Sequence, residues 1–198
     1  MDPATLFGFI LFAAVAGFTP GPNNLMLTAS GTNYGFRRSV PHITGILFGF
    51  MVVLVGTAFG MNSLFTVMPS LHKILKILSI MFLVYLAWKI ATSKRAAPGT
   101  KSKPLTFWTA AGFQLINPKG FSILLSAFAA FTSDAYDQTT QMLVIMGVFA
   151  IVTLSSSCTW CLFGTMIGRF LKEDRTLLIF NIFMATMLLV SLIPIITA

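Results

Sequence analysis

The sequence has 198 residues, of which 56% are hydrophobic and 9% charged, and its net charge is +8. Its mean hydropathy of +0.87 is too high for a chain whose surface faces water. These values exclude a soluble enzyme and indicate an integral membrane protein. Two cysteines, Cys158 and Cys161, are too few for a disulfide scaffold and are expected to be reduced.

Uncharged apolar stretches, divided at charges and turn residues, predict six transmembrane helices. In chain order they cover residues 5–31, 40–61, 73–92, 105–131, 140–168 and 177–197. A transmembrane β-barrel would instead show alternating segments of about ten residues. The expected fold class is therefore all-α and integral membrane. The chain opens Met1-Asp2-Pro3, without the basic region of a cleavable signal peptide, so the first helix is expected to stay in the mature protein.

Basic residues are divided unequally between the two ends of these helices. Ten Lys and Arg lie in or beside the gaps after the first, third and fifth helices, against Lys73 and Lys76 at the other end. The positive-inside rule then predicts a cytoplasmic basic end and two periplasmic termini. The basic residues form no face interleaved with aromatic residues, so nucleic acid is not an expected partner.

The chain divides into two three-helix units, residues 1–92 and 105–198, joined by a cytoplasmic linker at 93–104. Each unit opens with a Pro/Gly/Asn interruption at the middle of its first helix. These interruptions are Thr19-Pro20-Gly21-Pro22-Asn23 and Asn117-Pro118-Lys119-Gly120. Two three-helix units must insert in opposite directions, which predicts a 3+3 inverted repeat with broken helices 1 and 4. Matching interruptions in two halves are typical of a transporter's binding site.

Proline inside a helix leaves the carbonyl four residues earlier without its hydrogen bond. Pro20 and Pro22 therefore free the carbonyls of Ala16 and Phe18. Free carbonyls in hydrocarbon cost several kcal/mol and are tolerated only where protein, water or a solute binds them. A half-helix restarting near Asn23 would also point its N–H groups into the membrane, where they suit a carboxylate. The alternative is a proline kink that only helps the helices to pack.

Lys119 is the one acid or base that the sequence predicts at mid-membrane depth, where a charge costs at least about 2.5 kcal/mol. Its neighbour Pro118 frees the carbonyl of Gln114, and Gln114 and Asn117 add polar groups. All five acidic residues fall in loops or near the N-terminus, so no buried carboxylate is expected to hold a cation. The alternative is that Lys119 lies near an interface and extends its amine to water or phosphate.

The candidate substrate site combines the two interruptions with the polar residues beside them. It consists of Thr19, Pro20, Gly21, Pro22, Asn23, Asn24, Gln114, Asn117, Pro118 and Lys119. No cofactor or metal is expected, because His42 and His72 have no further ligand close in sequence. No intramembrane catalytic motif is found either, so an enzyme is not expected.

Two further patterns concern helix packing. Glycine pairs at 45/49, 56/60 and 164/168 predict close helix contacts. The polar run at 155–160 in the fifth helix either lines a path or forms hydrogen bonds between helices.

With these segments in place, the chain resembles the lysine-exporter (LysE/RhtB) family of bacterial amino-acid efflux proteins. The resemblance rests on the Thr-Pro-Gly-Pro-Asn and Asn-Pro-Lys segments and extends to residues 34–38 and 85–89. Residues 87–93 and the Gln-x-x-Asn-x-Lys arrangement at 114–119 are most similar to the family's exporters of cysteine and O-acetylserine.

The resemblance implies a secondary transporter of the bacterial inner membrane that exports small neutral amino acids or derivatives, such as cysteine, O-acetylserine or serine/threonine-like solutes, as a proton antiporter. Its expected partners are the amino acid, protons and the lipid bilayer, and a homodimer is left open. Lys119 would bind the carboxylate and is also a candidate for the proton carrier. The freed carbonyls of Ala16, Phe18 and Gln114, with Asn23 and Asn117, would bind the ammonium. A passive channel, a scaffold subunit and an exporter of another small metabolite remain alternatives.

Overall fold

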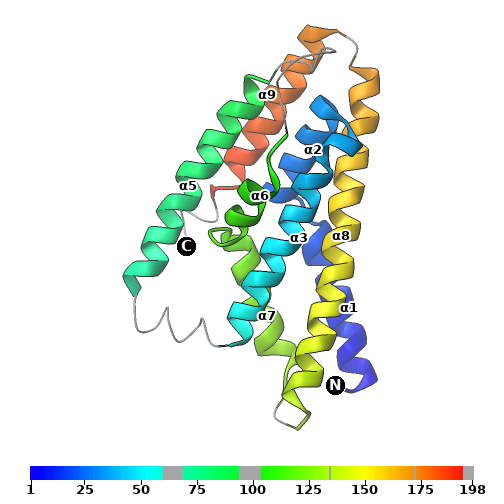
Figure 1. Cartoon of the computed structure of the whole chain (residues 1–198), viewed down its shortest axis with the longest axis vertical. Coiled ribbons are helices and arrows are strands. Elements are labelled where there is room, and N and C mark those ends of the chain that lie inside the picture. Colours follow the sequence, from blue (N-terminus) through cyan, green and yellow to red (C-terminus); the bar gives the residue numbers. More distant parts are fainter. Residues whose placement is uncertain (60–68, 94–103, 134, 172, 194–198) are drawn as a thin grey trace.

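The computed structural model describes residues 1–59, 69–93, 104–133, 135–171 and 173–193, and all regular structure in these ranges is α-helical (Figure 1). The all-α prediction is therefore confirmed for the described residues, whereas most of the predicted linker at 93–104 lies outside them. The helices are α1 (Pro3–Phe18), α2 (Pro22–Tyr34), α3 (Phe36–Ala58), α5 (Pro69–Ala91), α6 (Phe107–Gln114), α7 (Pro118–Phe131), α8 (Gln138–Phe170) and α9 (Asp174–Val190).

Two of the predicted helices are each a broken pair. The first is divided into α1 and α2, which are bent by 53°, and the fourth is divided into α6 and α7. Both breaks fall at the predicted proline interruptions. Among the described residues, α3 and α8 are long and apolar enough to cross a membrane, and the α1–α2 pair meets the same criterion as one bent span. The helix α9 has 17 described residues.

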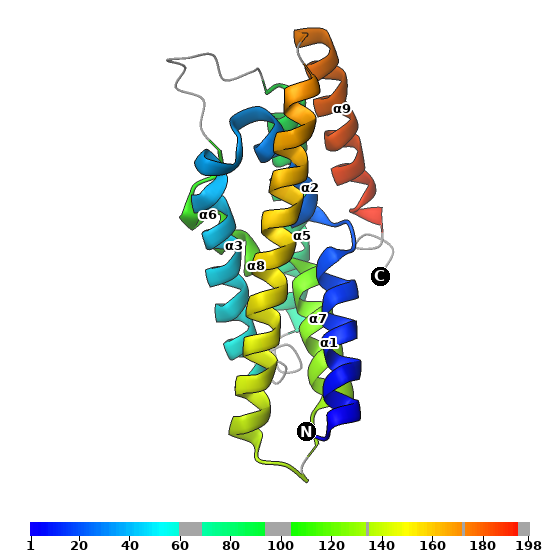
Figure 2. The same ribbon diagram turned by 90° about the vertical axis from the view of Figure 1, so that its right-hand side faces the viewer.

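Helices α1 and α8 begin at the same end of the molecule, each with an aspartate cap (Figure 2). Asp2 accepts a hydrogen bond from the backbone N–H of Thr5, and Asp137 accepts one from that of Thr140, at 2.9 and 2.7 Å. Side-chain and backbone hydrogen bonds from these threonines lower the pKa of both carboxyls. The charged form of each aspartate therefore satisfies an N–H group that its helix leaves unpaired.

The centre of the fold is α2, in which ten of 13 residues are buried. It packs most extensively against α8, and it also contacts α3, α5 and α9. Asn33 of α2 and Asn181 of α9 exchange amide hydrogen bonds of 2.9 and 3.2 Å. Asn181 also donates to the Ser93 carbonyl just after α5, at 3.0 Å. This polar network joins three helices.

Glycine allows the backbones of α2 and α8 to touch. A Cβ added at Gly164 would meet the Thr28 carbonyl, and one added at Gly168 would lie 2.7 Å from the Thr32 carbonyl oxygen. Thr32 in turn donates to the Gly164 carbonyl at 2.9 Å. Gly45 and Gly49 of α3 contact the backbone of α6 in the same way. The close contacts predicted for these two glycine pairs are confirmed, whereas Gly60 lies outside the described residues.

Replacing Gly164 by alanine is expected to destabilise the fold, because its new methyl group would meet backbone that cannot move independently of α2. Overpacking of this kind costs about 1–3 kcal/mol. We expect the Gly164→Ala protein to melt at a clearly lower temperature in detergent. The control is Gly147→Ala on the same helix, where a Cβ meets no atom within 4 Å. That variant should melt at or above the wild-type temperature, and equal melting of the two variants would contradict the packing argument.

Candidate functional site

The first break is a short extended segment between two half-helices. Helix α1 ends at Phe18, Thr19 and Gly21 are extended, and α2 begins at Pro22. Proline suits this first helical position because the N–H that it lacks would have no helical partner. Gly21 caps α2 without a side-chain hydrogen bond. The N–H groups of the first turn of α2 therefore point out of the helix end.

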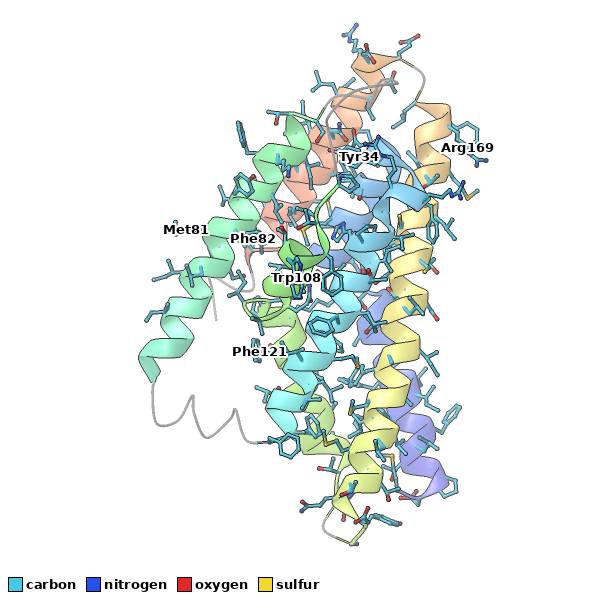
Figure 3. All side chains as sticks on the ribbon, in the orientation of Figure 1. Tyr34, Met81, Phe82, Trp108, Phe121 and Arg169 are labelled. Carbon is cyan, nitrogen blue, oxygen red and sulfur yellow. The ribbon has the colours of Figure 1, made fainter. Side chains whose placement is uncertain are left out.

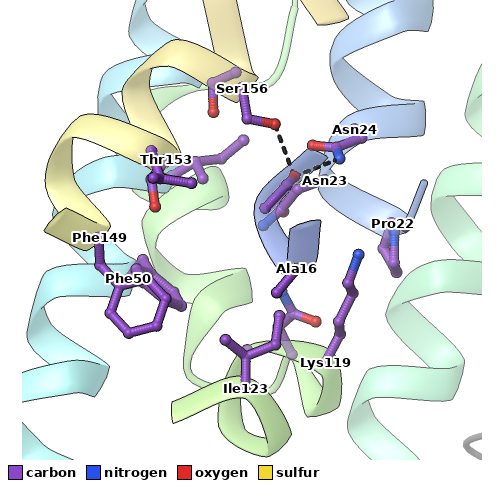
Figure 4. A pocket seen from close by; sticks show the side chains of 17 residues that line it. Ala16, Pro22, Asn23, Asn24, Phe50, Lys119, Ile123, Phe149, Thr153 and Ser156 are labelled. Carbon is purple, nitrogen blue, oxygen red and sulfur yellow. Dashed lines mark hydrogen bonds between the residues drawn. The ribbon is translucent and has the colours of Figure 1, made fainter. Parts of the chain in front are cut away.

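Side chains of α2 and α8 satisfy the carbonyls exposed at this break. The Asn24 amide donates to the carbonyls of Gly17 and Thr19, both at 3.0 Å, and the Ser156 hydroxyl of α8 donates to Gly17 at 2.8 Å (Figure 4). The proline argument had instead singled out the carbonyls of Ala16 and Phe18. The difference arises because the chain turns extended after Phe18, which presents the carbonyls of Gly17 and Thr19 to neighbouring side chains.

The second break brings Lys119 to the first. Helix α6 ends at Gln114, and α7 begins at Pro118 with Asn117 as a cap that makes no side-chain capping bond. Lys119 lies in the first turn of α7 and its Nζ donates to the Thr19 carbonyl at 2.7 Å, with the Pro20 carbonyl at 3.4 Å. The lysine ammonium thus binds the carbonyls of Thr19 and Pro20. The carbonyls that the sequence analysis had assigned to a substrate ammonium are instead those of Ala16, Phe18 and Gln114.

Gln114 positions amides from both breaks. It exchanges hydrogen bonds of 2.9 and 3.1 Å with Asn23, accepts one from Asn117 at 3.2 Å and donates to the Ala110 carbonyl. Among the residues that the structure describes, the buried Oδ1 of Asn117 has no hydrogen-bond partner. It is therefore an acceptor available to a ligand.

A cavity of about 70 Å³ lies between the two breaks (Figure 4). Of the ten residues predicted for the site, six line it: Gly21, Pro22, Asn23, Asn24, Asn117 and Lys119. The carbonyls of Thr19 and Pro20 contact the Lys119 amine. Gln114 is hydrogen-bonded to Asn23 and Asn117, and Pro118 is the first residue of α7. The predicted segments, 100 residues apart in the chain, do meet in space.

Residues that the sequence analysis had not assigned to the site form the rest of the wall. Phe50 of α3 and Phe149 of α8 stack edge to face, with ring centroids 5.5 Å apart, and form an apolar side. Thr153, Ser156 and Ser157 of α8 add hydroxyl groups. The polar run at 155–160 was the available signal for the serines. Nothing in the sequence distinguishes Phe50 and Phe149 from the other phenylalanines, because the chain contains 20 phenylalanines.

The electrostatics of the cavity are positive on one side. The N-terminal turns of α2 and α7 contribute Asn23, Asn24, Lys119 and Gly120 to its wall. Unpaired N–H groups and the dipole at such helix ends favour an anion, and the ammonium of Lys119 adds a full charge. The Asn117 Oδ1 and the Thr19 carbonyl are acceptors nearby. The arrangement suits a small solute that carries both an anionic and a cationic group. The described residues contain no cluster of three or more His, Cys, Asp or Glu that could hold a metal.

Comparisons with known proteins agree with the architecture. The family model described as LysE type translocator matches residues 14–193. The cysteine/O-acetylserine efflux protein of Escherichia coli (strain K12) is 31% identical over 176 residues, which cover 87% of this chain and 89% of that protein. The protein of the same name from Shigella sonnei (strain Ss046) has the same identity and coverage. No solved structure gives a significant match.

Removing the amide of Gln114 is expected to destabilise the site, because Gln114→Met leaves the half-buried Asn23 and the buried Asn117 without this partner. Unsatisfied buried polar groups cost about 1–3 kcal/mol each. Thermal unfolding in detergent should show a lower midpoint for this variant. The exposed Gln138 at the start of α8 provides the control, and Gln138→Met should unfold like the wild type. A wild-type midpoint for Gln114→Met would mean that Asn23 and Asn117 find other partners.

Proposed function

The chain belongs to the LysE-type translocator family, and we propose that it is a secondary transporter that exports small neutral amino acids or their derivatives across the inner membrane. The observation that carries the proposal is the contact between Lys119 and the Thr19 carbonyl, inside a cavity that two half-helix N-termini line. Broken helices that meet at a cavity are the usual construction of a transporter's substrate site.

The proposed binding mode is an exchange of partners. The substrate carboxylate pairs with the Lys119 ammonium and the N–H groups of the two half-helix ends. The substrate ammonium then takes the Thr19 carbonyl that Lys119 leaves, together with the Asn117 Oδ1. Each charged group of the site and of the solute keeps a partner throughout this exchange. The exchange also explains why the cavity needs no acidic residue.

Size and charge support a small neutral substrate. A cavity of about 70 Å³ is far below the roughly 300–1,000 Å³ of pockets for drug-sized ligands. A second positive charge, as in lysine or arginine, would lie near Lys119 with no carboxylate in the described wall. The rings of Phe50 and Phe149 give the cavity an apolar wall, which suits a substrate with a short apolar or weakly polar side chain. The relatives named for efflux of cysteine and O-acetylserine support the same class, and proton antiport is the proposed driving mechanism.

We also propose a six-span 3+3 inverted repeat, made of residues 1–92 and 105–198, with both termini in the periplasm. Support comes from the matching breaks α1–α2 and α6–α7. Figure 3 places Tyr34 and Arg169 at the same end of the molecule, opposite the start of α1. Arg37 and Arg38 follow that tyrosine by three and four residues in the chain. Basic residues at this end favour its cytoplasmic location.

The proposal is tested by uptake of labelled cysteine, O-acetylserine, threonine and lysine into inverted membrane vesicles, with and without a pH gradient. We expect saturable, gradient-dependent uptake of the neutral solutes and little uptake of lysine. Uptake that does not saturate and continues after the gradient is collapsed would indicate a passive channel instead. Uptake equal to that of vesicles without the protein would exclude a transport role.

Lys119→Met is expected to abolish transport while the protein still inserts, because the substitution removes a costly charge together with the carboxylate partner. A loss of about a hundredfold or more in uptake rate corresponds to one lost charged hydrogen bond of about 3 kcal/mol. Lys119→Arg should retain measurable binding and export the solute more slowly than the wild type, because the guanidinium keeps the positive charge but has a different shape from the ammonium. Lys76→Met in α5, away from the cavity, is the control. Wild-type export by Lys119→Met would overturn the assignment of the site.

Fusing reporters to the C-terminus tests the orientation. A reporter that is active only in the periplasm is expected to work, because ten Lys and Arg lie at the proposed cytoplasmic end. Activity from a reporter that functions only in the cytoplasm would mean that the orientation is reversed.

A further inference from the structure

His42 is a buried ionisable side chain whose role the proposed site does not explain. It lies in α3 and is 1% exposed. Within the described part of the chain, neither of its ring nitrogens has a hydrogen-bond partner. A neutral imidazole has one donor and one acceptor, and leaving such groups unsatisfied costs about 1–3 kcal/mol each. The position of His42 therefore needs an exchangeable partner.

A second cavity, of about 40 Å³, lies beside His42 and provides room for that partner. Its polar lining includes Ser30, Asn33 and Tyr34 of α2 and Lys89 of α5. No residue of its wall belongs to the wall of the broken-helix cavity. The Ser30 hydroxyl is already hydrogen-bonded to Ser39 at 2.7 Å, and Asn33 to Asn181. The imidazole is a buried polar group of this wall, and both of its ring nitrogens are unused.

The cavity is the right size for water and too small for the proposed substrate. A buried water needs roughly 10–15 Å³, so a cavity of about 40 Å³ holds about three or four waters. Waters between His42 and the neighbouring polar groups would satisfy both ring nitrogens. These waters could also donate protons to the His42 ring and accept protons from it, because its nitrogens are not held by other side chains.

We propose that His42 is the proton-binding residue of this chain, which rests on the proposed function as a gradient-driven exporter. Histidine is the side chain whose ordinary titration lies between pH 5 and 8, so a change of the His42 ring from buried to hydrated surroundings would switch its charge. Lys119, the ionisable group of the substrate cavity, is occupied by the Thr19 carbonyl. The two roles are therefore divided: the solute binds at Lys119 and the proton binds at His42.

The charged form of His42 does not suit the present packing. Lys89 of α5 and Tyr34 of α2 line the same cavity, and Arg38 precedes His42 by one turn of α3. On α8 the Cys161 thiol interacts with Ser39 of α3. The segment before α6 contributes the apolar Leu105 to the cavity wall. An imidazolium would therefore face cations and no described carboxylate. Protonation favours a packing in which water enters between α3 and α5.

The two cavities lie along the same pair of helices, which couples them. His42, Ile46 and Phe50 are spaced four residues apart and share one face of α3, and the latter two line the substrate cavity. In α2, Asn23 and Asn24 line the substrate cavity, whereas Ser30 and Asn33 line the second one. A shift of α2 against α3 that opens one cavity therefore changes the other.

The experiment compares wild type, His42→Gln and His72→Gln in proteoliposomes that contain labelled cysteine or O-acetylserine. Two rates are measured: export driven by an imposed pH gradient, and exchange of solute across equal pH. We expect His42→Gln to lose the stimulation by the gradient, a loss of about tenfold if the coupling is of ordinary size, while exchange continues. His72→Gln removes the other histidine of the chain and should keep both activities. Gradient-stimulated export by His42→Gln would overturn the proposal.

A second measurement reads His42 itself and does not require transport. In His72→Gln protein, His42 is the remaining histidine, and its ring can be followed by NMR between about pH 5 and 8. We expect its protonation to change when saturating cysteine is added. A ring that stays neutral over this range with and without solute would overturn the proposal, even if His42→Gln fails to fold. Wild-type vesicles that transport nothing would instead contradict the proposed function, while the NMR result would still decide the role of His42.

Discussion

The break between α1 and α2 is the constraint on which the rest of the structure depends. Two prolines prevent a continuous helix at Thr19–Pro22, and carbonyls left open inside a bilayer must be satisfied by protein. Asn24 from the following half-helix, Ser156 from α8 and Lys119 from α7 supply the donors. Three elements are therefore held around one interruption. The donors that stabilise the break are the same groups that line the cavity.

Close backbone packing decides which way this cavity can open. Gly31, Gly164 and Gly168 bring α2 and α8 into contact along the part of α2 that follows Asn24. This contact lies between the cavity and the end that carries Arg169. A solute in the cavity can pass between α2 and α8 toward that end only if the two helices separate. Because threonine hydroxyls also bridge the two helices there, such a separation breaks hydrogen bonds together with backbone contacts.

Sequence reasoning could locate the breaks, because proline and glycine act on their own backbone. It also found Lys119, since a charge within an apolar run has few explanations. It did not identify the carbonyls of Gly17 and Thr19 as the ones that side chains bind, because the path of the chain between two half-helices depends on tertiary partners such as Asn24. Phe50 and Phe149 could not be identified from sequence, because their role comes from the rotation of α3 and α8 about their axes. His42 was recognised as a poor metal ligand, but its lack of a partner became visible only in the fold.

The contact between Lys119 and Thr19 also sets a limit on affinity. In the proposed binding mode, a substrate ammonium replaces an ammonium that is already bound at 2.7 Å, so the gain in binding free energy is the difference between two similar interactions. The same holds at the other end of the solute, where Lys119 exchanges a carbonyl for a carboxylate. Each exchange leaves few unsatisfied polar groups with or without bound solute. Neither the empty nor the loaded site is therefore much lower in free energy than the other. Weak net binding with both states satisfied permits release, and release is the step that an exporter must complete against a concentration difference. A site built from a permanently unpaired lysine would bind more tightly and would hold its solute longer.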